Sequence, residues 1–348
     1  MFSAMITILC GGFGGARFAR GFVDAGFEVT LVVNTADDLT IFDAHVSPDI
    51  DMCLHALAGV LDEDQGWGII GDTCDFVDGL PATDRGWFRI GDLDLGFGLS
   101  RAAWLAQGMS VTDATDTLAR VRGVTTTVLP MTDGTVRTVV ETPLGLLPLQ
   151  EFLVRHRGAP RVDAVFQRSQ EPVEASTQVL RALRDAEVVV LGPSSPVASV
   201  LPILGLVREV LRQRTGPTVA VTPVVRSSAP TRRPEAFRYE IRERFLASRG
   251  IAHTPEAVAG LYLDVIDGFI GDVRDGLSLE GVRGRGGEPL ATRLADTLAP
   301  KGQGRADLAV ELVAFSREIS PAVAPLTPFG TSHHRHRSSS QSIGGIVT

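Results

Sequence analysis

The chain has 348 residues, of which 44% are hydrophobic and 21% are charged. This length allows one large domain or two smaller ones, and the composition excludes a wholly disordered chain, a collagen and a coiled coil. The formal net charge of −8 argues against a general nucleic-acid-binding or membrane-surface protein. The sequence has no apolar run long enough for a transmembrane helix and no charged start of a signal peptide. We therefore expect a cytoplasmic protein that has neither a nucleic acid nor a membrane as its partner.

The charge is distributed unevenly along the chain. Residues 21–84 contain fourteen Asp and Glu and no Lys or Arg, whereas the rest of the chain carries 33 basic and 27 acidic residues. Lys301 is the single lysine of the sequence. Cysteine is rare as well, because the chain has three cysteines without CxxC spacing, which favours reduced thiols over a disulfide framework or a zinc site.

Two stretches of the chain read as units of strand, helix and parallel strand. The first combines an apolar run near 5–10, a glycine turn, a helix over 16–25 and a strand over 28–33. The second has strands over 186–192 and 217–225 around a helix of about 198–213. These alternating elements predict an α/β fold with a doubly wound, mostly parallel Rossmann-like sheet.

The residues between these units predict additions to the sheet. Helical patterns cover 52–60, 99–107 and 110–121, and a β-hairpin is expected within 125–152, with Asp133-Gly134 as its turn. We interpret about 52–152 as a helical and hairpin insertion in a single α/β domain spanning 1–320. Residues 321–348 are rich in Pro, Ser, His and Gly, which predicts a disordered tail.

A glycine cluster, GGFGGAR, spans residues 11–17 directly after the first strand. Four glycines, Gly11, Gly12, Gly14 and Gly15, let the backbone approach a ligand, and a helix N-terminus offers N–H groups to a phosphate. Arg17 stands where a dinucleotide fingerprint has its third glycine, and no Walker A sequence is present. A tight turn that binds nothing remains the alternative.

Acidic residues gather after the second strand, in NTADD (34–38) and SPDID (47–51). Closely placed carboxylates remain ionised together only when a cation lies between them, and such oxygen ligands suit magnesium. We therefore predict magnesium ligands among Asp37, Asp38 and Asp49. A solvated acidic loop is the alternative, in which Asp49 or Asp51 only caps the following helix.

The GPSSP segment (192–196) lies between a strand and a helix. Its Pro193, Ser194 and Ser195 could present N–H and hydroxyl groups to a nucleotide phosphate. A plain helix cap is the alternative for the serines. Two loop-like clusters, around 91–96 and 129–138, would each be read as a turn if taken alone.

Taken together and in order, these segments resemble the 2-phospho-L-lactate transferase family of deazaflavin coenzyme F-420 biosynthesis. The resemblance runs from about residue 5 to about residue 275. Its carriers are GGFGGAR (11–17), NTADD (34–38), SPDID (47–51) with LAG (57–59), GWGIIGDT (66–73), WF-x-x-GD-x-DL (87–95), VLPMTDGTVRT (128–138), LQEFLV (149–154), GPSSPVASVLPIL (192–204) and VAVTPVV (219–225).

The resemblance implies an activity. A ribityl hydroxyl of the deazaflavin precursor FO attacks a guanosine-diphosphate-linked donor, takes over a phosphorylated three-carbon acid, and GMP leaves. The acid is phospholactate, phosphoenolpyruvate or phosphoglycerate. Such chemistry needs a phosphate cradle, a cation and an aligned nucleophile. The family also implies magnesium as cofactor and a homodimer.

The resemblance also assigns roles to residues of this chain. Asp49 and Asp51 become the predicted catalytic residues, with Asp49 closest to the reacting hydroxyl and a carboxylate taking its proton. The residues predicted to bind donor or acceptor are Gly11, Gly12, Gly14, Gly15, Asn34, Thr35, Arg89, Asp92, Asp133, Pro193, Ser194 and Ser195.

The stretch 226–251 departs from the family, which typically has a Lys-Gly-Pro motif after VTPVV. This chain has no lysine there, and Arg226, Arg232 or Arg233 would replace it as phosphate ligands. A non-catalytic nucleotide-binding or nucleotide-sugar-binding regulator of similar fold is therefore an alternative. An NAD(P)-dependent oxidoreductase is a weaker one, because the third glycine is missing and the acids exceed what a ribose needs.

Overall fold

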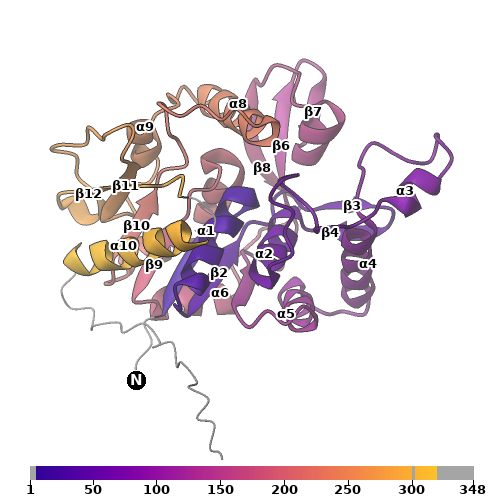
Figure 1. Cartoon of the computed structure of the whole chain (residues 1–348), viewed down its shortest axis with the longest axis horizontal. Coiled ribbons are helices and arrows are strands. Elements are labelled where there is room, and N and C mark those ends of the chain that lie inside the picture. Colours follow the sequence, from indigo (N-terminus) through magenta and orange to yellow (C-terminus); the bar gives the residue numbers. More distant parts are fainter. Residues whose placement is uncertain (1–4, 300–301, 320–348) are drawn as a thin grey trace, which may run out of the picture.

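A computed structural model describes residues 5–299 and 302–319 of the chain. The predicted tail over 321–348 lies outside the described residues. Seven parallel strands form the main sheet, in the order β12-β11-β10-β9-β1-β2-β5 (Figure 1). These strands are β1 (Ile6–Cys10), β2 (Val29–Val33), β5 (Thr127–Pro130), β9 (Val188–Leu191), β10 (Thr218–Val221), β11 (Gly268–Asp272) and β12 (Ala291–Ala295).

The strand order reverses direction at β1. From β1 the chain adds β2 and β5 on one side, then returns to add β9, β10, β11 and β12 on the other. This doubly wound order confirms the predicted fold class. It also creates a switch point between β1 and β9, where the carboxyl ends of neighbouring strands leave a crevice in which ligands bind in such sheets.

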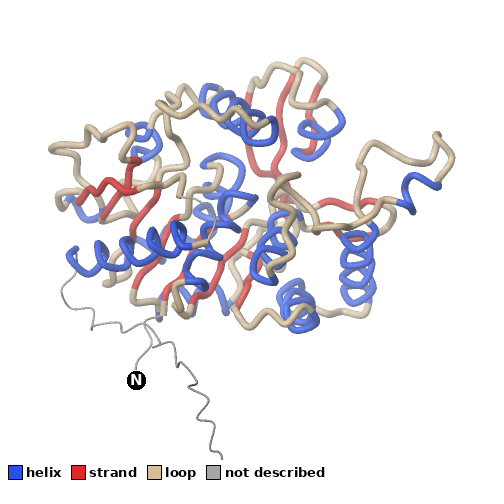
Figure 2. The backbone as a smooth tube through the Cα atoms, viewed as in Figure 1, coloured by secondary structure: helices blue, strands red, loops and turns tan. Residues whose placement is uncertain are grey.

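Helices cover both faces of the sheet, which lies in the middle of the molecule (Figure 2). Ile6, Ile8 and Cys10 of β1 face a core shared with α1 (Gly12–Asp24), α2 (Pro48–Ala58), α5 (Val111–Val121) and α10 (Gln303–Ile319). Leu9 faces the opposite core, which is shared with α6 (Thr177–Asp185), α7 (Leu201–Gln213), α8 (Arg233–Ala247) and α9 (Pro255–Gly260). Strands buried on both faces explain why they appear in the sequence as unbroken apolar runs.

Helix α1 begins earlier than predicted, because the glycine cluster belongs to its first turn instead of preceding it. A Cβ on Gly14 would lie 3.0 Å from the carbonyl oxygen of Pro193, and one on Gly15 would lie 2.8 Å from the Cβ of Cys10. Close packing therefore outweighs the low helix propensity of glycine here. In the second unit, the predicted helix is a π-helical turn, η2 (Pro196–Val200), that continues into α7.

The predicted hairpin turn at Asp133-Gly134 is wrong. Strand β5 pairs in parallel with β2 in the main sheet, while β6 (Val136–Thr142) pairs with β7 (Gly145–Pro148) and β8 (Ala164–Ser169) in a separate antiparallel sheet. Asp133-Gly134 therefore connects two sheets, and the hairpin turn follows Thr142. The reason is burial, since Val128 and Leu129 are buried and complete the edge of the main core.

For the same reason, 52–152 is not one continuous insertion. Strand β5 divides it into an addition between β2 and β5 and another between β5 and β9. The first holds α2, the hairpin of β3 (Leu39–Ile41) and β4 (Ala44–Val46), α3 (Asp75–Gly79), α4 (Asp92–Ala106) and α5. The second holds β6, β7, the π-turn η1 (Glu151–Arg155), β8 and α6. A short 3-10 turn, η3 (Arg285–Gly287), precedes β12.

Candidate active site

Four buried carboxylates lie beside the carboxyl ends of β1 and β2. Asp37 and Asp38 lie in the turn after β2, and Asp49 and Asp51 lie in the first turn of α2, which begins at Pro48 and not at residue 52 as predicted. Each of the four has an exposed fraction of 3–8%. Proline fits the first helical position because its missing N–H has no partner to lose there, and this start places Asp49 beside β1.

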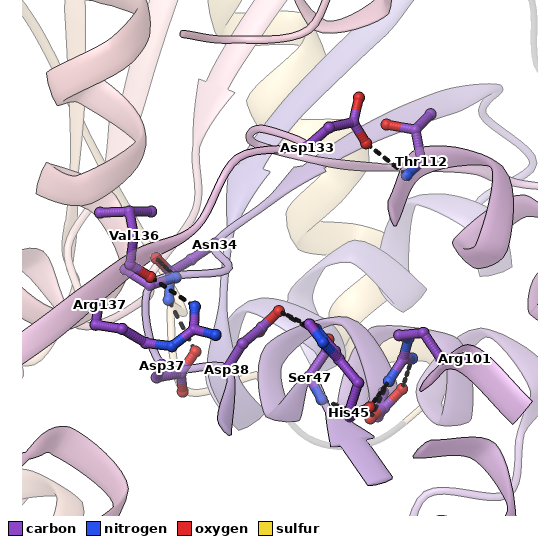
Figure 3. Close-up of polar contacts among 12 residues, drawn as sticks. Asn34, Asp37, Asp38, His45, Ser47, Arg101, Thr112, Asp133, Val136 and Arg137 are labelled. Carbon is purple, nitrogen blue, oxygen red and sulfur yellow. Dashed lines mark hydrogen bonds and ion pairs between the residues drawn. The ribbon is translucent and has the colours of Figure 1, made fainter. Parts of the chain in front are cut away.

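Asn34 connects two of these carboxylates. Its Nδ2 donates to Asp37 Oδ1 at 3.1 Å and to Asp49 Oδ2 at 3.0 Å (Figure 3 shows Asn34 and Asp37). Gln150 donates to the other oxygen of Asp37 at 3.0 Å, and the Ser199 hydroxyl donates to Asp49 Oδ2 at 3.4 Å. Only neutral amide and hydroxyl donors therefore hold Asp37 and Asp49. No arginine or histidine side chain within 5–299 and 302–319 forms an ion pair with either of them.

This environment disfavours negative charge. Burial, together with repulsion from Asp49 and Asp38, holds the pKa of Asp37 well above its usual range. Burial also raises the pKa of Asp49 to about 7, although hydrogen bonds from Asn34, the Gly12 backbone and Ser199 oppose the shift. Two carboxylates with raised pKa values beside one amide are the arrangement that a bound cation would stabilise.

Asp38 and Asp51 have partners of their own. Asp38 Oδ2 accepts from Ser47 Oγ at 2.9 Å and lies 3.0 Å from His45 Nε2, while its Oδ1 is buried without a partner in the described part of the chain. Asp51 forms a buried ion pair with Arg101 of α4 and accepts from the Ser47 backbone N–H at 3.2 Å (Figure 3 labels Ser47 and Arg101). Asp51 thus helps to fix the start of α2 from inside the helix, and the N-cap is Ser47, not Asp51 as the alternative interpretation proposed.

The side chain of Asp49 occupies the space beside Gly11 and Gly12 of the glycine cluster. A Cβ on Gly11 would lie 2.1 Å from Asp49 Oδ2, and one on Gly12 would lie 3.6 Å from Asp49 Oδ1. The Gly11 N–H donates to Ser194 Oγ at 3.0 Å. The carboxylate of Asp49 therefore lies against the start of α1. The partial positive charge of a helix N-terminus stabilises a carboxylate in this position.

Comparisons with known proteins identify the family of the chain. A family model described as "2-phospho-L-lactate transferase CofD" matches residues 6–268, which is most of the chain. The chain belongs to the 2-phospho-L-lactate transferase family. A relative of that name from Methanospirillum hungatei is 37% identical over 80% of this chain and 92% of its own length. A relative from Kitasatospora aureofaciens named phosphoenolpyruvate transferase is 31% identical over 90% of this chain and 98% of its own length.

A solved structure extends the fold comparison beyond the transferase family. A protein of the UPF0052 family from Bacillus halodurans superposes with a TM-score of 0.56 and covers 90% of this chain and 99% of its own. Its sequence identity of 16% supports a shared fold and nothing more. No helix among the residues described in this family member is long and apolar enough to span a membrane.

Several predicted binding residues lie beside the carboxylates or the glycine cluster. Thr35 is buried, and its hydroxyl has no partner among the described residues; Ser194 accepts a hydrogen bond from the Gly11 N–H. Ser195 acts as the helix cap that was its alternative reading, because its Oγ accepts from Ala198 N at 3.4 Å. Sequence reasoning missed Gln150 and Ser199 as partners of the carboxylates, although both lie inside segments that carry the family resemblance.

Three other predicted residues have local partners instead. Arg89 is 65% exposed at its side chain and pairs with Asp78 at 2.7 Å. Asp92 accepts from Asp75 N and Phe76 N, and so holds the first turn of α3. Asp133 accepts from Thr112 N in the first turn of α5 at 2.8 Å, and Figure 3 shows it apart from Asp37 and Asp38. Arg89 lines a pocket of about 280 Å³, and none of the four carboxylates is among the residues that line this pocket.

Proposed function

We propose that this protein transfers a phosphorylated three-carbon acid from a guanosine-diphosphate-linked donor to the ribityl hydroxyl of FO and releases GMP. The hydroxyl oxygen forms a bond to the phosphorus that carries the three-carbon acid. The bond between this phosphorus and the GMP oxygen breaks, and the hydroxyl proton passes to a carboxylate of the protein. Membership of the transferase family and the names of the relatives support this reaction class.

One observation carries the proposal: Asp37 and Asp49 are buried and share the side-chain amide of Asn34 beside the switch point, and no cationic side chain among the described residues pairs with either. Burying uncompensated carboxylates costs stability, so a purely structural role would favour their replacement by neutral residues. Their position at the carboxyl edge of the sheet is where a ligand enters such a fold. A cation and a diphosphate bound there would complete the charge balance.

Magnesium fits this donor set. The ion is commonly held by one or two carboxylates and completes its shell with water and substrate phosphates. No group of three or more His, Cys, Asp or Glu within the described ranges is placed so that it could hold a metal ion. In this proposal Asp37 and Asp49 would supply two protein ligands, and water and the diphosphate would complete the shell in place of the predicted third ligand, Asp38. The bound ion would neutralise charge on the diphosphate.

The remaining residues position the reactants in this proposal. Asp49 lies closest to the reacting hydroxyl, because it reaches from α2 to the glycine cluster. Asp51 positions it by fixing the first turn of α2 through Arg101 and Ser47. The start of α1 and the Pro193–Ser194 segment face the donor's diphosphate, since backbone N–H groups at a helix start favour anions.

The experiment is a transfer assay with purified protein, FO, magnesium and a panel of guanylylated phospholactate, phosphoenolpyruvate and phosphoglycerate. Mass spectrometry of the deazaflavin product identifies the acid, and GMP release gives the rate. The Asp49→Asn variant should lose at least about 100-fold in kcat, the lower range for a positioned acid–base group. Asp43→Asn is the matched control, because Asp43 is an exposed carboxylate of the β3–β4 turn.

Other outcomes of this assay would favour a different function for the protein. Tight binding of guanosine nucleotides without turnover of any donor would favour a regulatory nucleotide-binding protein. Binding of a nicotinamide nucleotide, with no effect of FO, would overturn the transferase. Near-full turnover by Asp49→Asn at saturating magnesium would remove Asp49 from the chemistry.

A further inference from the structure

A second pocket, of about 200 Å³, lies beside the start of α1. It lies among α1, α8, the ends of β10 and β12, and α10. Four arginines line it, together with a single acidic residue, Glu235; the arginines are Arg17, Arg238, Arg242 and Arg305. We call it the arginine pocket. Arginine predominates here although the whole chain is acidic.

The positive charge of this pocket is only partly compensated. Glu63 binds Arg305 at 2.6 and 3.0 Å and also lies 3.2 Å from Arg17. Arg238 donates to the carbonyl of Gly66 at 2.5 Å, but its other terminal nitrogen is buried without a partner in the described structure. Arg242 Nε is likewise buried and unpartnered within the described residues. Burial, with repulsion from Arg238, lowers the pKa of Arg242 to about 10.

An aromatic ring holds two of these guanidinium groups in place. Arg238 lies over the ring of Phe13 at 4.5 Å, and Arg17 lies over it at 4.9 Å. Stacking of this kind leaves the edges of the guanidinium groups available for hydrogen bonds to a ligand. Their positions are thus set before any ligand arrives, which lowers the entropic cost of binding.

The arginine pocket adjoins the carboxylate site. Gly14 and Pro193 line the pocket, while Gly11 and Gly12 of the same cluster contact Asp49. The carboxyl ends of β10 and β12 contribute Thr222 and Thr297, so the pocket opens at the same edge of the sheet. The start of α1 therefore separates an acidic end and a basic end of one ligand-binding edge.

We propose that the arginine pocket binds the carboxylate-bearing three-carbon end of the donor. This subsite rests on the proposed function. Guanidinium groups match carboxylate and phosphate oxygens in two-point contacts, and an anion would satisfy the unpartnered nitrogens of Arg238 and Arg242. The volume of about 200 Å³ lies below the range of about 300–1,000 Å³ typical of drug-sized ligands, so a small group fits better than a nucleoside.

The pocket also accounts for the missing lysine of segment 226–251. Arg226 forms ion pairs with Asp275 and Glu256, and Arg232 forms ion pairs with Asp64 and Glu235. These two arginines were predicted as phosphate ligands, but they have acidic partners. Arg238 and Arg242, one turn apart on α8, lie in the same segment and reach the pocket instead.

The test measures binding directly, by calorimetry, with phosphoenolpyruvate, GMP and inorganic phosphate as separate probes. Arg242→Gln should weaken phosphoenolpyruvate binding about 10- to 100-fold, the effect of losing a charged hydrogen bond, and should leave GMP binding unchanged. Arg242→Lys should recover part of the loss, since it restores the charge without the two-point geometry. Arg120→Gln is the control, because that arginine of α5 is 70% exposed at its side chain.

The melting temperature of Arg242→Gln should not fall, since the change removes a buried, unpaired charge. Unchanged phosphoenolpyruvate binding in Arg242→Gln, or no binding to the wild type at millimolar concentration, would overturn the proposal. An equal or larger loss for GMP would assign the pocket to the nucleotide. Phosphate that binds as tightly as phosphoenolpyruvate, with equal dependence on Arg242, would overturn the role of the carboxylate.

The arginine pocket and the proposed transferase function can be refuted independently of each other. Arg242-dependent phosphoenolpyruvate binding in a protein that transfers nothing to FO would retain the pocket and refute the transferase. Transfer to FO with a donor KM that Arg242→Gln leaves unchanged would retain the transferase and refute the pocket.

Discussion

Asn34 uses one amide nitrogen to hold two carboxylates that repel each other. The free energy of this arrangement is unfavourable, since both Asp37 and Asp49 have raised pKa values and neither has a cationic partner among the described residues. Such a residue is expected where a bound ligand or ion offsets the free-energy cost of its ionisation in the folded state. The burial of Asp37 and Asp49 therefore sets them apart from the carboxylates of a solvated acidic loop.

Gly11 offers a steric test of the same site. Its backbone is extended, with φ of −169°, so alanine meets no conformational penalty there. An added Cβ would lie 2.1 Å from Asp49 Oδ2 and 2.9 Å from Ser199 Cβ, and the carboxylate must move. We predict that Gly11→Ala destabilises the protein by about 1–3 kcal/mol and also lowers the transfer rate.

Chemical denaturation and the transfer assay check this prediction, with Gly96→Ala as the control. Gly96 lies exposed within α4, and a Cβ there meets nothing within 4 Å. That variant should gain about 0.5–1 kcal/mol, because alanine favours a helix interior. A Gly11→Ala protein as stable and active as the wild type would contradict the close approach of Asp49.

His253 predicts a pH dependence of stability. Burial, with the nearby charge of Arg242, lowers the pKa of His253 to about 4, from 6.5. Between these two values the unfolded chain binds a proton that the folded protein does not bind, so stability falls as the pH drops from about 6.5 to about 4. Denaturation at several pH values should show a smaller loss for His253→Gln. Replacing His156 by Gln, in the loop after η1, should leave the loss unchanged, and an unchanged loss in His253→Gln would refute the assignment.

At the scale of elements, Arg101 joins three parts of the site. It is fully buried on α4, pairs with Asp51 of α2, and donates to the carbonyl of His45 on β4 at 2.8 Å. The hairpin of β3 and β4 carries His45, which lies beside Asp38. One arginine therefore joins α2, which carries Asp49 and Asp51, to the hairpin whose His45 contacts Asp38.

Breaking this pair should be costly. Arg101→Leu leaves Asp51 buried without its partner, and we expect a loss of about 3–5 kcal/mol in the free energy of unfolding. The double variant Arg101→Leu with Asp51→Asn should recover part of that loss, because the unpaired charge is gone. Urea denaturation of the four proteins of this cycle gives the coupling free energy, and additive effects would show that the pair contributes nothing.

The elements that could be predicted from sequence were those with strong local patterns. The apolar runs of β1, β2, β9 and β10 and the flanking helices predicted the doubly wound sheet, and the observed strand order confirms it. Strand β5 was misassigned, because its apolar residues also fit the first arm of a hairpin and only pairing with β2 distinguishes the two. Pairing partners distant in sequence are a tertiary property that local periodicity does not contain.

At the scale of the whole molecule, the carboxylate half of the site was more predictable than the arginine half. Asp37, Asp38, Asp49 and Asp51 follow or begin predicted elements, so the strand edge places them together. Arg17, Arg238 and Arg242 meet only because α8 packs against the start of α1. No spacing in the sequence relates residue 17 to residue 242, and the separation of Arg238 and Arg242 by four positions was the only available signal.

The distribution of charge leads to a prediction for the whole protein. Residues 21–84 contribute fourteen acidic residues, among them the four buried carboxylates, while the remaining chain has an excess of basic residues that includes the arginine pocket. A diphosphate donor is repelled by the first group unless a divalent cation lies between them. We therefore expect donor affinity to fall by at least about tenfold when EDTA replaces magnesium, equivalent to about 1.4 kcal/mol. Phosphoenolpyruvate binding at the arginine pocket should persist in EDTA, because that end of the site needs no ion. Calorimetry with both ligands in both buffers makes the comparison, and donor affinity that is unchanged in EDTA would remove the metal from the acidic segment.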